Sequence, residues 1–327
     1  MTATAADLIQ QGDALVERRE YMEALRYYDG ALALDATSPQ AWFRKGYAYS
    51  RLRRDGDAAR CYLESTRLAP EATAAWLNLG NSLQNIGQAE NALDCFNTVT
   101  RLDPNCAAAW VSKGELLAEQ GSVEEAVQSY DQAVALSPEN AAAWARRGDC
   151  LRRLGQTAAA LESYRKALAC DAFHEAALFG SAACLLRGQQ WAAALEFIER
   201  GLQMNPDWAA GWSNRGEAYR RLQRPIDALE SFEQAAALDP GLPYSWNDKG
   251  EVLGGLGRWE DALESFDHAL AAAPTFAPAW FGRGQALFNL GQYQAAARAC
   301  DRFLDLADRD DPRLPTARQL AKECASR

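Results

Sequence analysis

Glycine recurs along this chain at a fixed spacing of 34 residues, and this regularity constrains the fold more than any other feature of the sequence. The grid holds Gly12, Gly46, Gly80, Gly114, Gly148, Gly216, Gly250 and Gly284, with Ala182 at the ninth point. Self-similarity at such a period indicates supersecondary units that stack on one another and share a continuous core. We therefore expect one repeat array rather than the two globular domains that a length of 327 residues would suggest.

Other residue types follow the same grid. Tryptophan stands four residues before it, at Trp42, Trp76, Trp110, Trp144, Trp212, Trp246 and Trp280, with Leu8 and Leu178 at the remaining two points. Alanine stands twelve residues after it in all nine units, and a large apolar residue follows four positions later, except for Cys300. Proline then closes most of the units, as at Pro104 and Pro138.

Each unit has the pattern of two amphipathic helices, for example 107–120 and 123–136, because apolar residues recur there at helical spacing. Five turn glycines separate such helices, namely Gly87, Gly121, Gly155, Gly257 and Gly291. Proline ends the second helix because it lacks the backbone donor. We expect the small Gly and Ala residues to bring the two helices together, and the Trp and Phe or Tyr side chains to fill the gap to the next unit.

This combination of period, Trp, Gly, Ala, aromatic residue and Pro resembles the tetratricopeptide repeat family. The resemblance implies an all-α, right-handed superhelical solenoid of antiparallel helix pairs. It divides the chain into an N-terminal extension (1–4), nine units within 5–310 and a C-terminal capping helix (311–327). The units begin at 5, 39, 73, 107, 141, 175, 209, 243 and 277, and we expect the array to be complete.

The net charge of −10 and a pI near 4.9 disfavour binding to nucleic acid or to anionic lipid. We expect no membrane insertion, because no apolar run is long enough to span a bilayer. The eight cysteines form no CxxC pair, which favours reduced thiols and a cytoplasmic location. With two histidines, His174 and His268, a zinc site is not expected, nor is any other metal or cofactor. Motifs for nucleophilic or phosphate chemistry are lacking, so we expect no enzymatic activity.

The family resemblance implies a concave groove, lined by the first helix of each unit, that holds an extended segment of a partner. We expect the second, fifth, sixth, ninth, twelfth and thirteenth residues of each unit to point into it. The repeat that begins at residue 39 then offers Phe43, Arg44 and Tyr47, and the repeat that begins at residue 73 offers Asn78, Asn81 and Asn85. The three asparagines share one helix face, where their amides could clamp a peptide backbone. The alternative is a polar face that binds only water.

Arginine dominates the inner positions of the fifth to seventh repeats, which begin at residues 141, 175 and 209. These positions hold Arg146, Arg152, Arg153, Arg187, Arg220 and Arg221, together with Asn214. Guanidinium groups bind carboxylates through paired hydrogen bonds, so an acidic segment or a C-terminal carboxylate is the predicted ligand. Two alternatives remain: the arginines could compensate the dipoles of the helix C-termini, or nearby acids such as Glu217 and Glu251 could neutralise them.

The sixth repeat, which begins at residue 175, departs from the pattern, with Leu178, Ala182 and Gly201 in place of Trp, Gly and Ala. It is interpreted either as a hinge or altered curvature beside the arginines, or as ordinary drift within a repeat array. The predicted function is a scaffold, adaptor or assembly factor that binds a protein or peptide segment, possibly acidic. The alternative is a regulatory or targeting subunit of an enzyme complex that binds a folded partner through its outer faces or ends.

Overall fold

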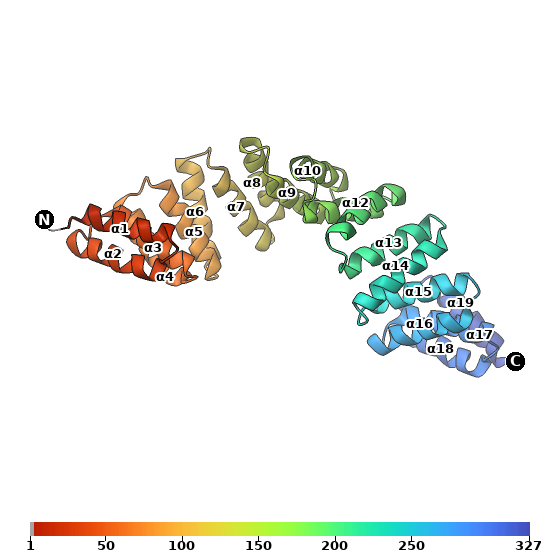
Figure 1. Cartoon of the computed structure of the whole chain (residues 1–327). Helices are drawn as coiled ribbons and strands as arrows, with labels where there is room; N and C mark the ends of the chain where they lie inside the picture. Colours follow the sequence, from red (N-terminus) through yellow and green to blue (C-terminus); the bar gives the residue numbers. More distant parts are fainter. Residues whose placement is uncertain (1–2) are drawn as a thin grey trace. The chain divides into compact units, whose positions relative to one another are not determined.

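The computed structural model describes residues 3–327, and every regular element in that range is an α-helix. Nineteen helices follow one another along this part of the chain (Figure 1). Consecutive helices pack against each other as pairs, and each pair packs on the next within its unit. The predicted all-α solenoid of helix pairs is therefore confirmed. The chain divides after Asp171 into two compact units, called the first unit and the second unit. The 34-residue elements are called repeats from here on.

The first unit contains ten helices: α1 (Ala5–Glu17), α2 (Tyr21–Leu34), α3 (Pro39–Arg51), α4 (Asp55–Leu68), α5 (Thr73–Asn85), α6 (Ala89–Leu102), α7 (Ala107–Glu119), α8 (Val123–Leu136), α9 (Ala141–Arg153) and α10 (Thr157–Cys170). The second unit contains nine: α11 (Glu175–Arg187), α12 (Trp191–Met204), α13 (Ala209–Arg221), α14 (Pro225–Leu238), α15 (Pro243–Gly255), α16 (Trp259–Ala272), α17 (Ala277–Asn289), α18 (Tyr293–Leu306) and α19 (Leu314–Ala325). Counting the first residue of each odd-numbered helix from α1 to α17 as position 1 gives every repeat the same 34 positions.

The grid glycine at position 8 makes room for the aromatic ring at position 24 of the same repeat. A methyl group on Gly46 would lie 2.9 Å from Cδ1 of Tyr62, and one on Gly216 would lie 2.7 Å from Cδ1 of Phe232. Both rings are completely buried. The ring also reaches the next repeat, as expected: Tyr62 shares an apolar cluster with Leu79 and Cys95, and a methyl group on Gly282 would lie 2.3 Å from Phe266. The ring lies directly on its own repeat's glycine, because only a residue without Cβ lets the two helices approach that closely.

The turn between the two helices has the same backbone in all nine repeats. Position 15 takes a positive φ in each of them, and five of these residues are the glycines noted above. The other four are Arg19, Arg53, Gln189 and Gln223, with φ between 56° and 64°. A side chain in this left-handed region costs about 1 kcal/mol, so the packing of the two helices imposes the turn even where the residue opposes it.

Each grid tryptophan fastens the start of its helix to the preceding loop. The indole Nε1 of Trp76 donates to the carbonyl oxygen of Pro70 at 2.9 Å, six residues earlier. Equivalent bonds, of 2.8–3.1 Å, are made by Trp42, Trp110, Trp144, Trp212, Trp246 and Trp280. A partly buried tryptophan with its one polar atom satisfied combines a large apolar contact with a fixed orientation.

Repeat six replaces these features with a different packing solution. Its Phe179 stacks on Trp208, with ring centroids 3.7 Å apart. Two glycines make room for this pair, because a methyl group on Gly201 would lie 2.8 Å from Phe179, and one on Gly211 would overlap the Trp208 ring. Gly201, which departs from the repeat pattern in the sequence, therefore has a local packing reason.

Odd-numbered helices form one continuous face within each unit. In the first unit α1 contacts α3, α3 contacts α5, α5 contacts α7 and α7 contacts α9; in the second unit α13, α15, α17 and α19 form the same kind of row. Among the described residues, the even-numbered helices make no comparable contacts with one another. The odd-numbered helices therefore lie closer together, and their shared surface is called the inner face.

Helix α19 packs on α18 and α17, and buries Ala317 and Cys324. Within residues 3–327, none of the helices has the length and apolar character needed to cross a membrane. All eight cysteines are free thiols, of which Cys170 is exposed and Cys106 is partly exposed. The remaining six are buried, and burial raises the pKa of Cys61 and Cys95 to about 11. These buried thiols contribute to the core as small apolar side chains.

Candidate functional site

Contacts between neighbouring odd-numbered helices identify which positions share the inner face. Arg44 at position 6 lies 3.3 Å from Asp13 at position 9 of the previous repeat, and Arg146 lies 3.4 Å from Glu115 in the same relation. Gln84 at position 12 donates to Glu119 at position 13 of the next repeat. The inner face is thus lined by positions 6, 9, 12 and 13, as the sequence pattern predicts.

The aromatic residues of α3 lie on this face over the buried core. Phe43 packs against Tyr62 with ring centroids 5.6 Å apart, and Tyr47 is partly exposed beside it. Arg44 is engaged with Asp13, whereas Arg51 at the helix end donates to the hydroxyl of Tyr21 at 3.3 Å. The structure therefore brings Phe43, Arg44 and Tyr47 together on one helix turn of the inner face.

A buried hydroxyl lies directly below these residues without a partner. In repeats one and five the ring hydroxyl at position 24 donates to the aspartate at position 9: Tyr28 to Asp13 and Tyr164 to Asp149, both at 2.7 Å. In repeat two position 9 is Tyr47, and the fully buried Tyr62 hydroxyl has no hydrogen-bond acceptor among residues 3–327. Burial raises the pKa of Tyr62, so this group remains a proton donor.

The three asparagines of α5 have different surroundings. Asn78 donates its amide to the carbonyl of Ala74 on its own helix at 2.8 Å, and Asn85 donates to Asp55 at 3.2 Å. Asn81 is partly exposed and makes no hydrogen bond with any other residue in the range 3–327. Asn81 therefore has both its donor and its acceptor available to a ligand, and the other two retain their carbonyl oxygens.

Two of the three predicted arginines of α9 form long local ion pairs. Arg146 is more than half exposed and lies 3.4 Å from Glu115, while Arg152 lies 3.8 Å from Asp149. Arg153 donates to the backbone carbonyl of Ala118 in the neighbouring α7 at 2.9 Å. Exposed pairs at such distances contribute little to stability, so a ligand carboxylate could compete for these guanidinium groups.

The predicted arginines of the second unit are held more tightly, apart from Arg187. Glu217 accepts from both Arg220 Nε and Arg221 Nε at 2.7 Å, and Arg220 also reaches Glu251 at 3.4 Å. Arg187 is exposed and has no ion pair within the described part of the chain, and Asn214 likewise makes no hydrogen bond there. The local neutralisation considered from the sequence therefore occurs at Arg220 and Arg221.

An acidic cluster on α13 and α15 surrounds Arg220 and consists of Glu217, Asp248 and Glu251. Asp248 is largely buried, and burial together with the nearby Glu251 raises its pKa to about 6, although Arg220 opposes the rise. No described cation lies within 4.0 Å of the Asp248 carboxylate. Asn247 donates to Asp248 at 3.4 Å and to Glu251 at 3.2 Å, while its own buried Oδ1 has no partner.

A pocket of about 440 Å³ opens beside this cluster. Its lining residues are Arg220, Gln223, Pro225, Glu251, Val252, Gly255 and Leu256. Proline, valine and leucine provide an apolar wall, and Arg220 and Glu251 provide opposite charges. The residue next to the wall, Ile226, is 69% exposed, so apolar surface continues beyond the pocket.

Sequence reasoning missed a second recurring contact, made by a cation at position 7. This cation lies over the tryptophan at position 4 of its own repeat and pairs with an acid at position 25 of the previous one. Arg147 shows both contacts, with its guanidinium carbon 5.8 Å from the Trp144 ring centroid and Nε 2.6 Å from Asp131. Lys45, Arg215, Lys249 and Arg283 repeat the arrangement. The signal was available, because these residues lie on the 34-residue grid.

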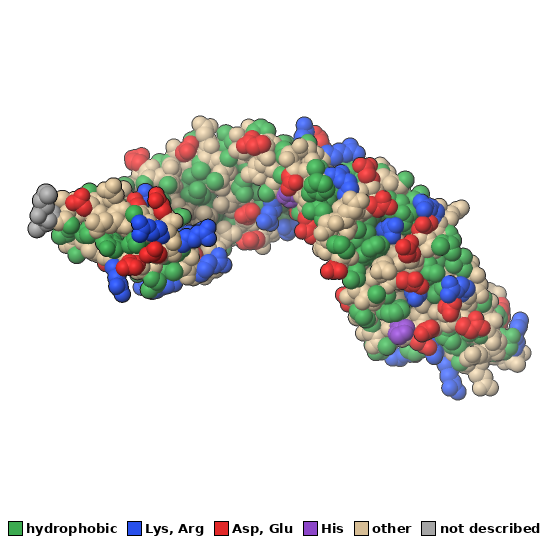
Figure 2. Space-filling model, in the orientation of Figure 1, with side chains coloured by type: hydrophobic (Ala, Val, Ile, Leu, Met, Phe, Trp, Pro, Cys, Tyr) green, Lys and Arg blue, Asp and Glu red, His purple; other side chains and the backbone are tan. Residues whose placement is uncertain are grey.

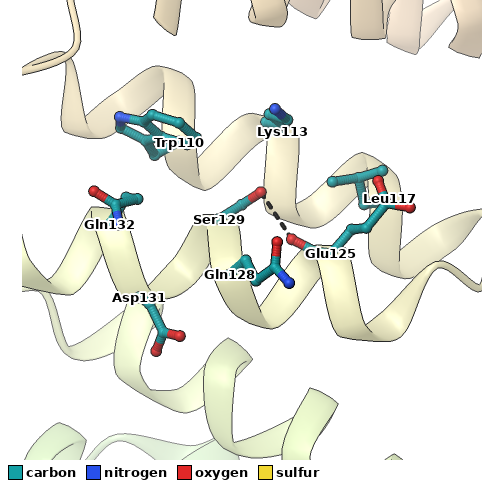
Figure 3. Close-up of a pocket in the computed structure, with 8 residues that line it drawn as sticks. All are labelled: Trp110, Lys113, Leu117, Glu125, Gln128, Ser129, Asp131 and Gln132. Carbon is teal, nitrogen blue, oxygen red and sulfur yellow. Dashed lines mark hydrogen bonds between the residues drawn. The ribbon is translucent and has the colours of Figure 1, made fainter.

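Lys113 is the exception, because position 25 of the preceding repeat is Asn97. It lies over Trp110 and lines a pocket of about 450 Å³ between α7 and α8 (Figure 3). In that view Asp131 points away from Lys113, toward the next helix, where it binds Arg147. Equivalent positions line pockets in repeats two and eight, so this cavity belongs to the repeat packing and does not single out one ligand site.

Basic and acidic side chains are interleaved along both units on the face that Figure 2 shows. Within residues 3–327 there is no group of three or more His, Cys, Asp or Glu side chains placed to hold a metal ion. The side chains described on the inner face offer hydrogen bonds, charges and aromatic surface.

Family models match along most of the chain. Models described as tetratricopeptide repeat match residues 124–175 and 247–312, residues 151–215 and residues 209–242. A model described as the C-terminal domain of cilia and flagella-associated protein 70 matches residues 1–147. A search of curated proteins gave no significant match.

Solved structures of repeat proteins share the fold. YrrB, described as a TPR protein with an unusual peptide-binding site, aligns over 57% of this chain and 96% of its own length, with 22% identity and a TM-score of 0.53. PilF of Pseudomonas aeruginosa aligns over 65% of this chain and 97% of its own, with 19% identity and a TM-score of 0.56. A tetratricopeptide repeat protein of Parabacteroides merdae aligns over 77% and 98%, with 16% identity and a TM-score of 0.54. With the family models, the helix pairs and the 34-residue signature in agreement, this chain is a tetratricopeptide repeat protein.

Proposed function

We propose that this protein is a non-enzymatic scaffold, an adaptor or assembly factor, that binds an extended segment of a partner protein along its inner face. The observation that carries the proposal is the unused bonding capacity of that face in the first unit. Asn81 has no hydrogen-bond partner among the described residues, and Asn78 and Asn85 use only their amide nitrogens, so that their carbonyl oxygens stay available. An extended peptide backbone offers donors and acceptors at regular spacing, and would satisfy such groups.

Acidic side chains in the segment would bind the arginines of α9. Arg146 and Arg152 hold their own acids at 3.4 and 3.8 Å, longer than a close charge-assisted hydrogen bond, and Arg146 is well exposed. A ligand carboxylate could displace Glu115 or Asp149 at small cost. In the second unit the exposed Arg187 is the arginine best placed for the same role, while Arg220 and Arg221 are held by Glu217. The eight free thiols support a reducing compartment, the cytoplasm, as the place of action.

Site-specific photo-crosslinking tests which face binds. A photoreactive residue is placed at Ala74, an exposed inner-face position of α5, and separately at Glu90, an exposed position of α6. After incubation with extract of the native cell, we expect a partner adduct from position 74, mapping to a single extended peptide. Adducts from position 90 alone would contradict inner-face binding and favour a partner docked on the even-numbered helices, as a regulatory or targeting subunit would require.

Charge reversal tests the acidic character of the segment. The double change Arg152→Glu with Arg153→Glu should weaken capture of the crosslinked partner at least about tenfold, because two attractive pairs become repulsive. Arg165→Glu is the matched control, because Arg165 is exposed on the neighbouring α10 and makes no ion pair with the described residues. Equal affinity of the double variant and the control would reject carboxylate recognition at α9, while leaving the crosslinking result intact.

A further inference from the structure

The second unit carries a buried hydrogen-bond acceptor that lacks a donor among the described residues. Asn247 is 4% exposed, and its Oδ1 has no partner among the described residues. The amide of the same side chain lies 3.4 Å from Asp248 and 3.2 Å from Glu251, so the unsatisfied oxygen belongs to the acidic cluster. A buried acceptor left without a donor destabilises the folded chain, and a bound donor would recover that loss.

The charges of the cluster do not balance. Glu217, Asp248 and Glu251 bring three carboxylates, and Arg220 and Arg221 bring two guanidinium groups. Both arginines are bound by Glu217, and Arg220 makes only a 3.4 Å contact with Glu251. Asp248 has no ion pair with any described residue. One negative charge is therefore left without a cation beside it.

Another guanidinium group of the chain, that of Arg313, interacts electrostatically with Glu251 of this cluster. Arg313, which precedes α19, binds Asp311 and lies over the rings of Phe281 and Phe303 on repeat nine. The hydrogen bond to Asp311 is the main cause that raises the pKa of Arg313, and Glu251 of the cluster adds a smaller contribution. The Arg313 guanidinium, packed on apolar rings, is thus already stabilised beside this row of helices.

We propose that the acidic cluster and the pocket beside it form a binding site for an arginine side chain of a partner. The methylene stem would lie on Pro225, Val252 and Leu256, which line the pocket of about 440 Å³. The planar guanidinium would donate to Asp248, to Glu251 and to the free oxygen of Asn247. Its fork of five N–H donors can serve several acceptors at once, which a compact ammonium cannot do in the same geometry. This site deepens the proposed function and rests on it, since the partner segment would carry the arginine.

Titration of the full ¹⁵N-labelled chain with methylguanidinium tests the site without any partner. The readout is the side-chain amide signal of Asn247, assigned from its loss in Asn247→Ser, at pH 7.5, where Asp248 is ionised. We expect a saturable shift of this signal that sodium chloride at the same ionic strength does not reproduce. Methylammonium should bind more weakly, because it lacks the planar fork.

The variant Asp248→Asn should weaken methylguanidinium binding at least about fivefold, since it removes a charge-assisted contact but keeps the shape of the side chain. Glu230→Gln, at an exposed position of α14 without an ion pair to the described residues, is the control and should bind like the unchanged chain. A shift that sodium chloride reproduces, equal affinity in Asp248→Asn, or equal binding of methylammonium would overturn the arginine site. A flat titration with partner crosslinking intact rejects this site alone, and a saturable titration without crosslinking rejects the proposed function alone.

Discussion

The regions around α3 and around α13–α15 leave opposite kinds of hydrogen bond unmet. At position 9, the aspartate of repeats one and five becomes Tyr47 in repeat two, and the Tyr62 hydroxyl is left as a donor without an acceptor. In repeat eight, position 5 is Asn247 and position 6 is Asp248; the Asn247 oxygen is an acceptor without a donor, and Asp248 has no ion pair among the described residues. Single substitutions in the repeat can therefore leave either a donor or an acceptor without a partner among the described residues.

The two regions should rest on the same packing of glycine against a buried ring, and glycine substitutions test whether they do. Gly46→Ala in the first region and Gly216→Ala in the second should each destabilise the protein by about 2–3 kcal/mol. In both cases the new methyl group would lie within 2.9 Å of a buried ring. The measurement is the free energy of unfolding in urea. Gly56→Ala, at an exposed helical position with nothing within 4 Å, should stabilise by up to about 1 kcal/mol. Unequal losses at Gly46 and Gly216 would show that the two regions rest on different cores.

The second region should respond to pH through Asp248, whose neighbours are Glu217, Arg220, Asn247 and Glu251. Its pKa in the folded chain, about 6, exceeds the ordinary value of 3.8, so the folded state binds the proton more tightly than the unfolded state. The free energy of unfolding should therefore rise as the pH falls from about 7 to about 4, by up to about 3 kcal/mol. Asp248→Asn should abolish this contribution and raise stability at neutral pH. Identical pH profiles for the two proteins, measured by thermal unfolding, would count against an unpaired Asp248.

The first region should respond to loss of a hydroxyl. Tyr62→Phe removes a buried donor that has no acceptor, and should leave stability unchanged or raise it by about 1 kcal/mol. Tyr28→Phe and Tyr164→Phe are the matched controls, because each breaks a 2.7 Å bond to an aspartate, and each should lose about 1 kcal/mol. The measurement is the midpoint of urea unfolding for the three variants. If Tyr62→Phe loses as much as the two controls, Tyr62 has an acceptor in solution and the contrast between the regions disappears.

Much of the fold could be predicted from sequence because each repeat restates the same constraints. Gly at position 8 and a ring at position 24 determine one helix pair, and the copies identify the period. The turn was predictable at Gly87 and four other glycines, but not at Arg53 or Gln223, whose positive φ comes from the packing of the helices. Residue preference carries no signal where tertiary packing overrides it.

The candidate site was less predictable, since its chemistry depends on offsets between neighbouring helices. The i,i+3 and i,i+4 pairs of Glu217 with Arg220 and Arg221 could be foreseen from helical spacing. The contacts of Arg146 with Glu115 and of Arg44 with Asp13 join adjacent repeats, and the sequence alone does not specify that register. That the arginines and asparagines bind a partner stays a prediction.

The hydrogen bonds from the grid tryptophans to the preceding loops have a consequence for observing this molecule. Seven indole protons, one in each repeat except the first and the sixth, are held in the same chemical setting. Each is released to solvent only when its own helix start detaches from its loop. Their separate deuterium-exchange rates would therefore measure local opening at seven places along the chain. Comparing these rates would show how opening spreads from one repeat to the next without any mutation.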